Sequence, residues 1–145
     1  MPMNSQSVGR DVSLDLYTSK GILAIPATAI TKFDTTPVTT NTTSKGLDGL
    51  TRYGVFPDGW KGSLEIDRMN GAIDAFWAQI EADFYSGANT MPGTITETIQ
   101  EPDGSISQYR YTGVMFDLKD AGSKVANQLI KQKLDFMAAR RLKVA

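Results

Sequence analysis

The fold is decided by an alternating stretch near the end of the chain, QLIKQKLDFMA, at residues 128–138. From Ile130 onward the even positions are mostly apolar, whereas the odd positions include Lys131, Lys133 and Asp135. A period of two held over about ten residues predicts a long strand with one buried face. Residues 109–144 as a whole predict a hairpin that runs into this basic strand. Because so long a strand has to pair with others, the sequence predicts a β-walled protein that associates with itself.

The composition is that of one globular domain, residues 1–145. Of these residues 41% are apolar and 21% are charged, and a chain of this length buries roughly 70% of its unfolded surface. No segment approaches the roughly 18 apolar residues that a membrane span needs. Residues 1–10 lack the apolar run of a secretory signal. We therefore expect a protein that is made and folded in a cytoplasm and has no membrane partner.

Most catalytic chemistry is missing, because the chain has no histidine and no cysteine. The commonest general base, thiol nucleophiles, disulfides and most transition-metal sites are thereby excluded. The 16 Asp and Glu residues show no convergent pair of the kind that cleaves glycosides. No phosphate-binding or calcium-binding loop pattern is present. The sequence predicts a protein that is not an enzyme and has no cofactor or metal, and whose chemistry is hydrogen bonding and burial between subunits.

The charges are unevenly distributed, although the net charge is only −1. Residues 69–109 hold six acidic groups and no basic one, whereas residues 110–145 hold eight basic groups and three acidic ones. Opposed blocks of charge suit head-to-tail contact between copies. The alternative is that the blocks face solvent or neutralise each other inside one subunit. A nucleic-acid-binding domain would be basic overall, which this chain is not.

The first half of the chain predicts strands. Residues 12–17 and 22–25 predict a strand pair around a turn, and residues 60–68 predict a further strand. Residues 28–43 contain eight threonines, which favour an extended backbone, and we expect this strand to be broken near Pro37.

Residues 42–57 are polar and contain Gly46, Gly49 and Gly54, and they are too many for a tight turn. Long loops in compact domains are usually functional or mobile. We interpret this passage as an extended stacking loop, an arm that grips a neighbour; a disordered surface loop is the alternative. The candidate contact residues are Lys45, Leu47, Asp48, Leu50, Arg52 and Tyr53.

Residues 70–86 predict one amphipathic helix. Asn70 can cap its start, and Gly87 can end it in a left-handed conformation. Its acidic residues, Asp74 among them, are expected to face away from the core. The apolar stripe is typical of core packing rather than of a ligand site, so the helix should close one face or corner of the β-structure. The predicted core residues are Ile73, Phe76, Trp77, Ile80 and Phe84.

Residues 94–111 predict a hairpin around Asp103-Gly104. With a two-residue turn, Glu97 would lie opposite Arg110 as a cross-strand pair of opposite charge. Neither face of this hairpin would be cleanly apolar, which fits a sheet whose second side lines a water-filled space.

The order of these elements resembles that of the tail tube (inner tube) proteins of long-tailed bacteriophages, which are related to the tubes of R-type pyocins and type VI secretion. The matching segments are the opening strand pair (12–25), the arm (42–57), the strand GWKGSLEIDR (59–68), the helix (70–86) and the ending QLIKQKLDF (128–136). The resemblance covers almost the whole chain and rests on pattern, since the family has no catalytic signature.

The resemblance implies an antiparallel β-sandwich or partly closed barrel with one flanking helix. Six copies would form a ring, and rings would stack into a virion tail tube through the arm and an N-terminal arm, residues 1–11. The bore would pass double-stranded DNA into the host and hold the tape measure protein. Further partners would be the baseplate and tail terminator proteins, and a sheath if the tail is contractile. Assembly would take place in the host cytoplasm.

Surface chemistry then suggests which side chains face the bore. A DNA duplex sticks to a basic wall and slides past a hydroxyl-rich or acidic one. We therefore expect the basic strand, with Lys131 and Lys133, to face partners. The candidate bore residues are Thr94, Thr96, Thr98 and Gln100, or their acidic alternates Glu97 and Glu101. A tube subunit of a pyocin-like or type VI-like contractile device, and an unrelated β-barrel binding module, stay open as alternatives.

Overall fold

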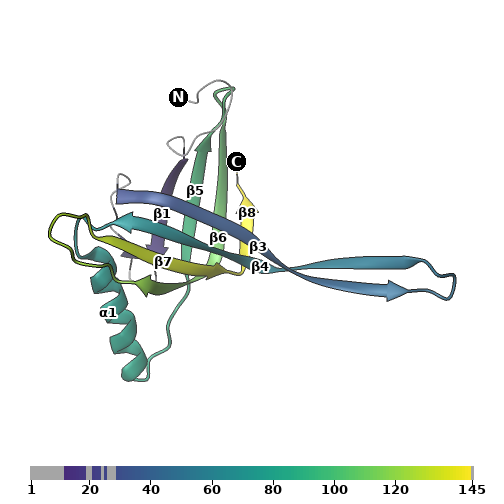
Figure 1. Cartoon of the computed structure of the whole chain (residues 1–145), viewed down its shortest axis with the longest axis horizontal. Helices are drawn as coiled ribbons and strands as arrows, with labels where there is room; N and C mark the ends of the chain where they lie inside the picture. Colours follow the sequence, from purple (N-terminus) through teal and green to yellow (C-terminus); the bar gives the residue numbers. More distant parts are fainter. Residues whose placement is uncertain (1–11, 19–20, 24, 26–28, 145) are drawn as a thin grey trace.

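The computed structural model describes residues 12–18, 21–23, 25 and 29–144, and in this part of the chain it is an antiparallel β-structure with one α-helix (Figure 1). In chain order the elements are β1 (Val12–Thr18), β2 (Gly21–Ile22), β3 (Ile30–Lys45), β4 (Thr51–Asp67), α1 (Ala72–Tyr85), β5 (Gly93–Gln100), β6 (Ile106–Asp120), β7 (Lys131–Ala138) and β8 (Arg140–Lys143). The strands form one open sheet in the order β2-β1-β5-β6-β7-β4-β3, and β8 pairs with β6 beside this path. The predicted fold class is confirmed. The predicted N-terminal arm, residues 1–11, lies outside the described residues.

β6 is shared by the two halves of the sheet, one with β1, β5 and β8 and the other with β3, β4 and β7. Its first part pairs with β5 on one side and β8 on the other, and its last part, from Met115, pairs with β7. Between these parts Gly113 has a φ of +64°, and a Cβ there would lie 3.0 Å from the Ala139 Cβ. Glycine adopts this left-handed conformation without steric cost. The strand can therefore turn a corner here, which brings β1, β5 and β8 over β3, β4 and β7.

The core between the two halves is centred on Tyr111 of β6, which is fully buried. Its ring meets three aromatic rings edge-on, at centroid distances of 6.2 Å to Phe33 of β3, 6.1 Å to Trp60 of β4 and 5.8 Å to Phe136 of β7. One β6 side chain thus contacts three strands of the opposite half. Such aromatic pairs stabilise by about 0.5–1.5 kcal/mol beyond their burial.

β7 has the predicted period of two, although the strand starts at Lys131 rather than at residue 128. Its even residues are buried and most of its odd residues are exposed. The buried polar residue Gln132 is satisfied, because its Nε2 donates to Asp74 Oδ1 at 2.9 Å and to the Ala121 carbonyl at 3.2 Å. The prediction that Asp74 faces away from the core is therefore wrong. The buried even residues are Gln132, Leu134, Phe136 and Ala138.

α1 lies within the predicted range and ends at Gly87 as predicted, but its N-cap is Gly71 rather than Asn70, which precedes the cap. The Ala72 N–H donates to Asn70 Oδ1 at 3.0 Å. At the other end Gly87 has a φ of +84°, and the Ala88 N–H donates to the Asp83 carbonyl at 2.8 Å, which is a Schellman motif.

The predicted helix core is correct only for the first part of α1. Ile73 is buried, and Phe76, Trp77 and Ile80 are half-buried. Phe84 is 68% exposed, so its predicted core position is wrong. The helix projects past the sheet at this end (Figure 1), which leaves the last turns without a strand beneath them.

The β5–β6 hairpin is present, but its turn has three residues instead of two. The Glu101 N–H donates to the Ser105 carbonyl at 2.8 Å, and Gly104 has a φ of +92°. Glu97 consequently lies opposite Tyr109, so the predicted Glu97–Arg110 pair is wrong. One extra turn residue shifts the register by one and exchanges the faces of β6 relative to β5.

β3 runs straight through Pro37, where a break was expected. Of the described residues in the expected second strand, 22–25, only Ile22 lies in a strand, β2. Pro37 is tolerated because β3 is an edge strand, where a missing N–H costs no ladder bond. The irregularity comes one residue later, as a bulge between Val38 and Thr39. Opposite it Gly59 has a φ of +115°, and a Cβ there would lie 2.7 Å from the Ala138 carbonyl oxygen.

Candidate self-assembly interface

In the described part of the body, the longer strands with a free edge are β1 and β3; the short strands β2 and β8 also pair on one side only. β3 pairs only with β4, over its whole 16 residues. β1 pairs with β5 on one side, but on the other side only Tyr17 and Thr18 pair with β2. Unpaired rows of backbone N–H and C=O groups readily accept another strand. The body therefore carries two long edges that a second copy can extend.

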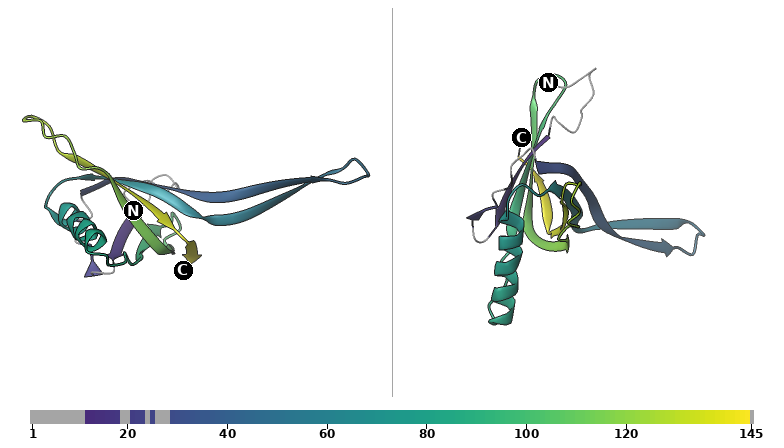
Figure 2. Two further views of the ribbon diagram at one scale, coloured as in Figure 1. Left: turned by 90° about the horizontal axis from the view of Figure 1, so that it is seen from below. Right: turned by 60° about the vertical axis from the view of Figure 1, so that its left-hand side comes forward.

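Residues 42–57, expected to be a long loop, are the end of a β-hairpin. We call residues 39–57 the arm: they form ladder pairs from Thr39–Pro57 to Lys45–Thr51. The neighbouring strand β7 pairs with β4 only from Trp60 onward. The arm is thus a two-stranded ribbon, and it extends far from the body in three views (Figures 1 and 2). An isolated two-stranded ribbon is marginally stable in water, so contact with a partner surface would stabilise the arm.

The predicted stacking residues all lie at the end of the arm. The turn is closed by the Gly46 N–H, which donates to the Leu50 carbonyl at 3.0 Å, and by the Leu50 N–H, which donates to Asp48 Oδ1 at 3.0 Å. Arg52 approaches Asp48 at 3.8 Å with both side chains largely exposed. The structure brings these residues together and leaves the apolar ones, Leu47, Leu50 and Tyr53, exposed to solvent.

The predicted bore residues do not share one face. Glu97 is 8% exposed and lies on the core face of β5, so the prediction that it faces the bore is wrong. Glu101 lies in the β5–β6 turn. The opposite face of β5 carries Thr94, Thr96, Thr98 and Gln100, among which Thr96 is the least exposed.

Glu97 belongs to a polar cluster that the sequence analysis missed. Its Oε1 lies 3.6 Å from a terminal nitrogen of Arg141, whose guanidinium stacks at 3.7 Å over the Tyr109 ring and 4.8 Å from the Trp60 ring. Burial raises the pKa of Glu97 although Arg141 opposes this shift. Burial likewise raises the pKa of Tyr111. No pattern in the sequence indicated this cluster, because Arg141 lies opposite Tyr111 only in a register that the structure gives.

The basic strand β7 is neutralised by its neighbours. Lys131 Nζ lies 3.1 Å from Asp67 Oδ1, and Lys133 lies opposite Glu65 in the β4–β7 register. On the other side Asp117 lies opposite Asp135 and forms an ion pair of 2.6 Å with Lys119. The outer face of β4, β7 and β6 therefore carries both acidic and basic side chains and is not a basic patch.

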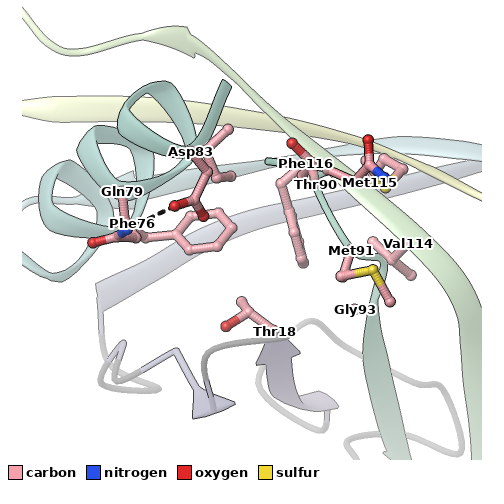
Figure 3. Close-up of a pocket in the computed structure, with 12 residues that line it drawn as sticks. Thr18, Phe76, Gln79, Asp83, Thr90, Met91, Gly93, Val114, Met115 and Phe116 are labelled. Carbon is pink, nitrogen blue, oxygen red and sulfur yellow. Dashed lines mark hydrogen bonds between the residues drawn. The ribbon is translucent and has the colours of Figure 1, made fainter. Parts of the chain in front are cut away.

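A small cleft of about 160 Å³ lies between α1 and the start of β5 (Figure 3). Apolar side chains such as Phe76, Met91 and Phe116 line it, and its acid, Asp83, accepts a hydrogen bond from Gln79 Nε2 at 2.9 Å. The cleft pairs no nucleophile with a base. In residues 12–18, 21–23, 25 and 29–144 no group of three His, Cys, Asp or Glu side chains could hold a metal ion. Across the same residues no helix is both long and apolar enough to cross a bilayer.

Solved structures of injection devices and tails share this architecture. A chain of the extended sheath–tube complex of the extracellular contractile injection system PVC matches with a TM-score of 0.66 and 12% identity, over 99% of this chain and 94% of its own. A chain of the anti-feeding prophage tube-terminating cap matches with 0.66 and 10%, over 99% and 93%. A chain of the tail of an empty GTA particle, with C6 symmetry, matches with 0.51 and 15%, over 97% and 100%.

This chain has the fold of those components. At such identities the similarity establishes the fold, and it agrees with the resemblance to tail tube proteins. All three neighbours are parts of structural assemblies rather than enzymes. The sequence matches no protein-family model and no curated protein.

Proposed function

We propose that this protein is the subunit of a tail tube, built as stacked rings of identical copies around a hollow centre. The observation that carries the proposal is the pair of free edges, on β1 and β3, together with an arm that has no second layer in its own subunit. Ring closure through β1 of one copy and β3 of the next would satisfy both edges. The arm would then contact a copy in an adjacent ring.

Six copies per ring is the symmetry we propose. It is supported by two structural neighbours, a GTA tail with C6 symmetry and an anti-feeding prophage baseplate that is 6-fold symmetrised. The tube would belong to a virion assembled in a bacterial cytoplasm and would conduct double-stranded DNA. Its further partners would be the tape measure, baseplate and terminator proteins, with a sheath in a contractile tail.

The bore face we propose is the hydroxyl-rich side of β5, with Thr94, Thr98 and Gln100 and, to a smaller extent, Thr96. Such a face offers hydrogen bonds but no positive charge to hold a duplex. A map of the assembled tube tests this assignment. Lys131 and Lys133 pointing into the bore without acidic partners would contradict it.

A second candidate function is the tube of a contractile injection device that is not a phage tail. The neighbours with the higher TM-scores, 0.66 and 0.66, come from such devices. Genes next to the coding sequence separate the two, since a virion requires capsid and packaging genes and an injection device does not. An unrelated β-barrel binding module is the third alternative.

Electron microscopy of the purified protein over a range of concentrations tests the assembly itself. We expect rings or hollow tubes at high concentration, and sedimentation should show large particles. A single compact species at every concentration would contradict the proposal and favour the binding module.

A further inference from the structure

α1 carries an aromatic stripe whose last part its own subunit does not cover. Trp77, Glu81, Phe84 and Tyr85 follow the spacing i, i+4, i+7 and i+8, which places them on one side of the helix. Phe84 and Tyr85 are 68% and 83% exposed, and their rings meet edge-on at 5.3 Å. Ile73, eleven residues before Phe84, lies on nearly the same side of the helix and is buried, so the exposure of Phe84 comes from its place at the end that projects past the sheet.

The arm carries a second uncovered apolar row. Tyr53, Val55 and Pro57 alternate along β4 and therefore share one face, and Tyr53 and Val55 are 79% and 64% exposed. On β3 this face continues the row of Phe33 and Thr35, which faces the core within the body. The row is thus the outer part of a core face whose second layer is missing.

The two surfaces are complementary in charge. α1 contains three acidic residues and no basic one, and none of the residues in its last turn is basic. The carbonyl end of a helix is also the negative end of its dipole, which attracts cations. The arm carries Lys45, which lies opposite Thr51 on the Tyr53 face, and Arg52, which pairs with Asp48, so that the net charge of the arm is +1. A cationic arm end therefore suits the anionic end of α1.

The two surfaces also match in length. The nine residues of helix from Trp77 to Tyr85 span about 12 Å, and the five residues of strand from Thr51 to Val55 span about 13 Å. In Figures 1 and 2 the arm and α1 lie at opposite ends of the molecule, so that the two cannot meet within one subunit.

We infer that the arm of one copy docks on α1 of another copy, with Val55 next to Trp77, Tyr53 between Glu81 and Tyr85, and Lys45 at the Tyr85 end of the helix, within reach of Glu81. The inference rests on the proposed self-assembly and names the surface that receives the arm. It explains why the last turns of α1 are aromatic although no strand of their own subunit covers them.

Site-specific cross-linking tests this contact, since the natural chain has no cysteine. We expect the variant with Tyr53→Cys and Tyr85→Cys, assembled and treated with a short bismaleimide, to give a ladder of covalent oligomers on a denaturing gel. The control pairs Tyr53→Cys with Ile106→Cys, an exposed residue on the β5–β6 hairpin, and should give none. Normal tubes without the ladder would overturn the docking and leave the tube function standing. Wild-type protein that remains monomeric would overturn both.

Charge exchange gives a second test, independent of cysteine. Lys45→Glu or Glu81→Lys alone should raise the concentration needed for assembly about 2- to 5-fold, and the two together should restore it. Lys124→Glu, a charge reversal in an exposed loop, is the matched control and should change nothing. Equal assembly by all four variants, or a double variant no better than the singles, would overturn the docking, because another partner would then cover the helix.

Discussion

β3 and β4 build two regions that differ in what holds them together. Within the body, these strands pack their inner side chains on Tyr111 and Phe136, and β4 also pairs with β7. Within the arm, the same two strands keep only their ladder with each other. Burial stabilises the first region, at roughly 25 cal/mol per Å² of apolar surface, whereas backbone pairing alone holds the second. The body buries its apolar side chains in a core of its own, whereas the apolar side chains of the arm stay exposed within the subunit.

The largest effect should come from two matched tyrosine substitutions. Tyr111→Ala removes a ring that is fully buried and should lower the free energy of unfolding by about 3–5 kcal/mol. Tyr53→Ala, in the arm, removes a ring that is 79% exposed and should change it by no more than about 0.5 kcal/mol. Urea denaturation of the unassembled protein measures both. Equal losses would mean that the arm is part of the folding core.

Removing the arm should separate folding from assembly. Residues 39–58 can be replaced by Asn-Gly, which closes the Val38–Gly59 pair with a tight type I′ turn. We expect the free energy of unfolding to change by less than about 1 kcal/mol, because an uncovered ribbon is marginally stable, and we expect tubes to be absent by electron microscopy. Tubes of normal length from this variant would contradict the role given to the arm.

A smaller, pH-dependent effect is expected from Glu97 in the body. Burial raises the pKa of this carboxyl above its ordinary value of 4.5. The native state therefore favours the protonated form, and the stability that Glu97 contributes is present below pH 4.5 and lost as the pH rises through the folded pKa. Compared with Glu97→Gln, the wild type should gain relative stability between neutral pH and about pH 4. Parallel pH curves of the unfolding free energy would contradict this.

The smallest effect is expected at the end of α1. Phe84→Ala should change the unfolding free energy of the monomer by no more than about 0.5 kcal/mol, because the ring is 68% exposed. Phe76→Ala is the control: its ring packs edge-on against Phe116 at 5.6 Å and should cost about 1–3 kcal/mol. A large loss at Phe84 in the monomer would show that the helix end is covered within its own subunit.

Local patterns predicted much of this fold. The period of two in β7 and the helix with its Gly87 end follow from side-chain direction and backbone freedom, which are properties of a few neighbouring residues. Register does not. With a two-residue turn Glu97 would lie opposite Arg110 as a surface pair. With the three-residue turn of the structure it lies opposite Tyr109 and in the core.

The ends of elements were equally beyond local prediction. The stripe that includes Phe84 has helical periodicity throughout, but how far a helix continues beyond its sheet depends on tertiary packing. The arm was recognisable as a projecting segment from its polar, glycine-containing sequence. Its two-stranded form was not, because threonine-rich extended chain pairs only when the partner strand is in place.

The course of β6 has a consequence for how the subunit bears force. Because this one strand is hydrogen-bonded to β5 and β8 before Gly113 and to β7 after it, the two layers are linked by covalent backbone as well as by packing. Tension that enters through one layer leaves through the other along peptide bonds, and neither layer can peel away without breaking the ladders of its companion. An assembly of such subunits would therefore resist stretching through covalent backbone that runs through both layers.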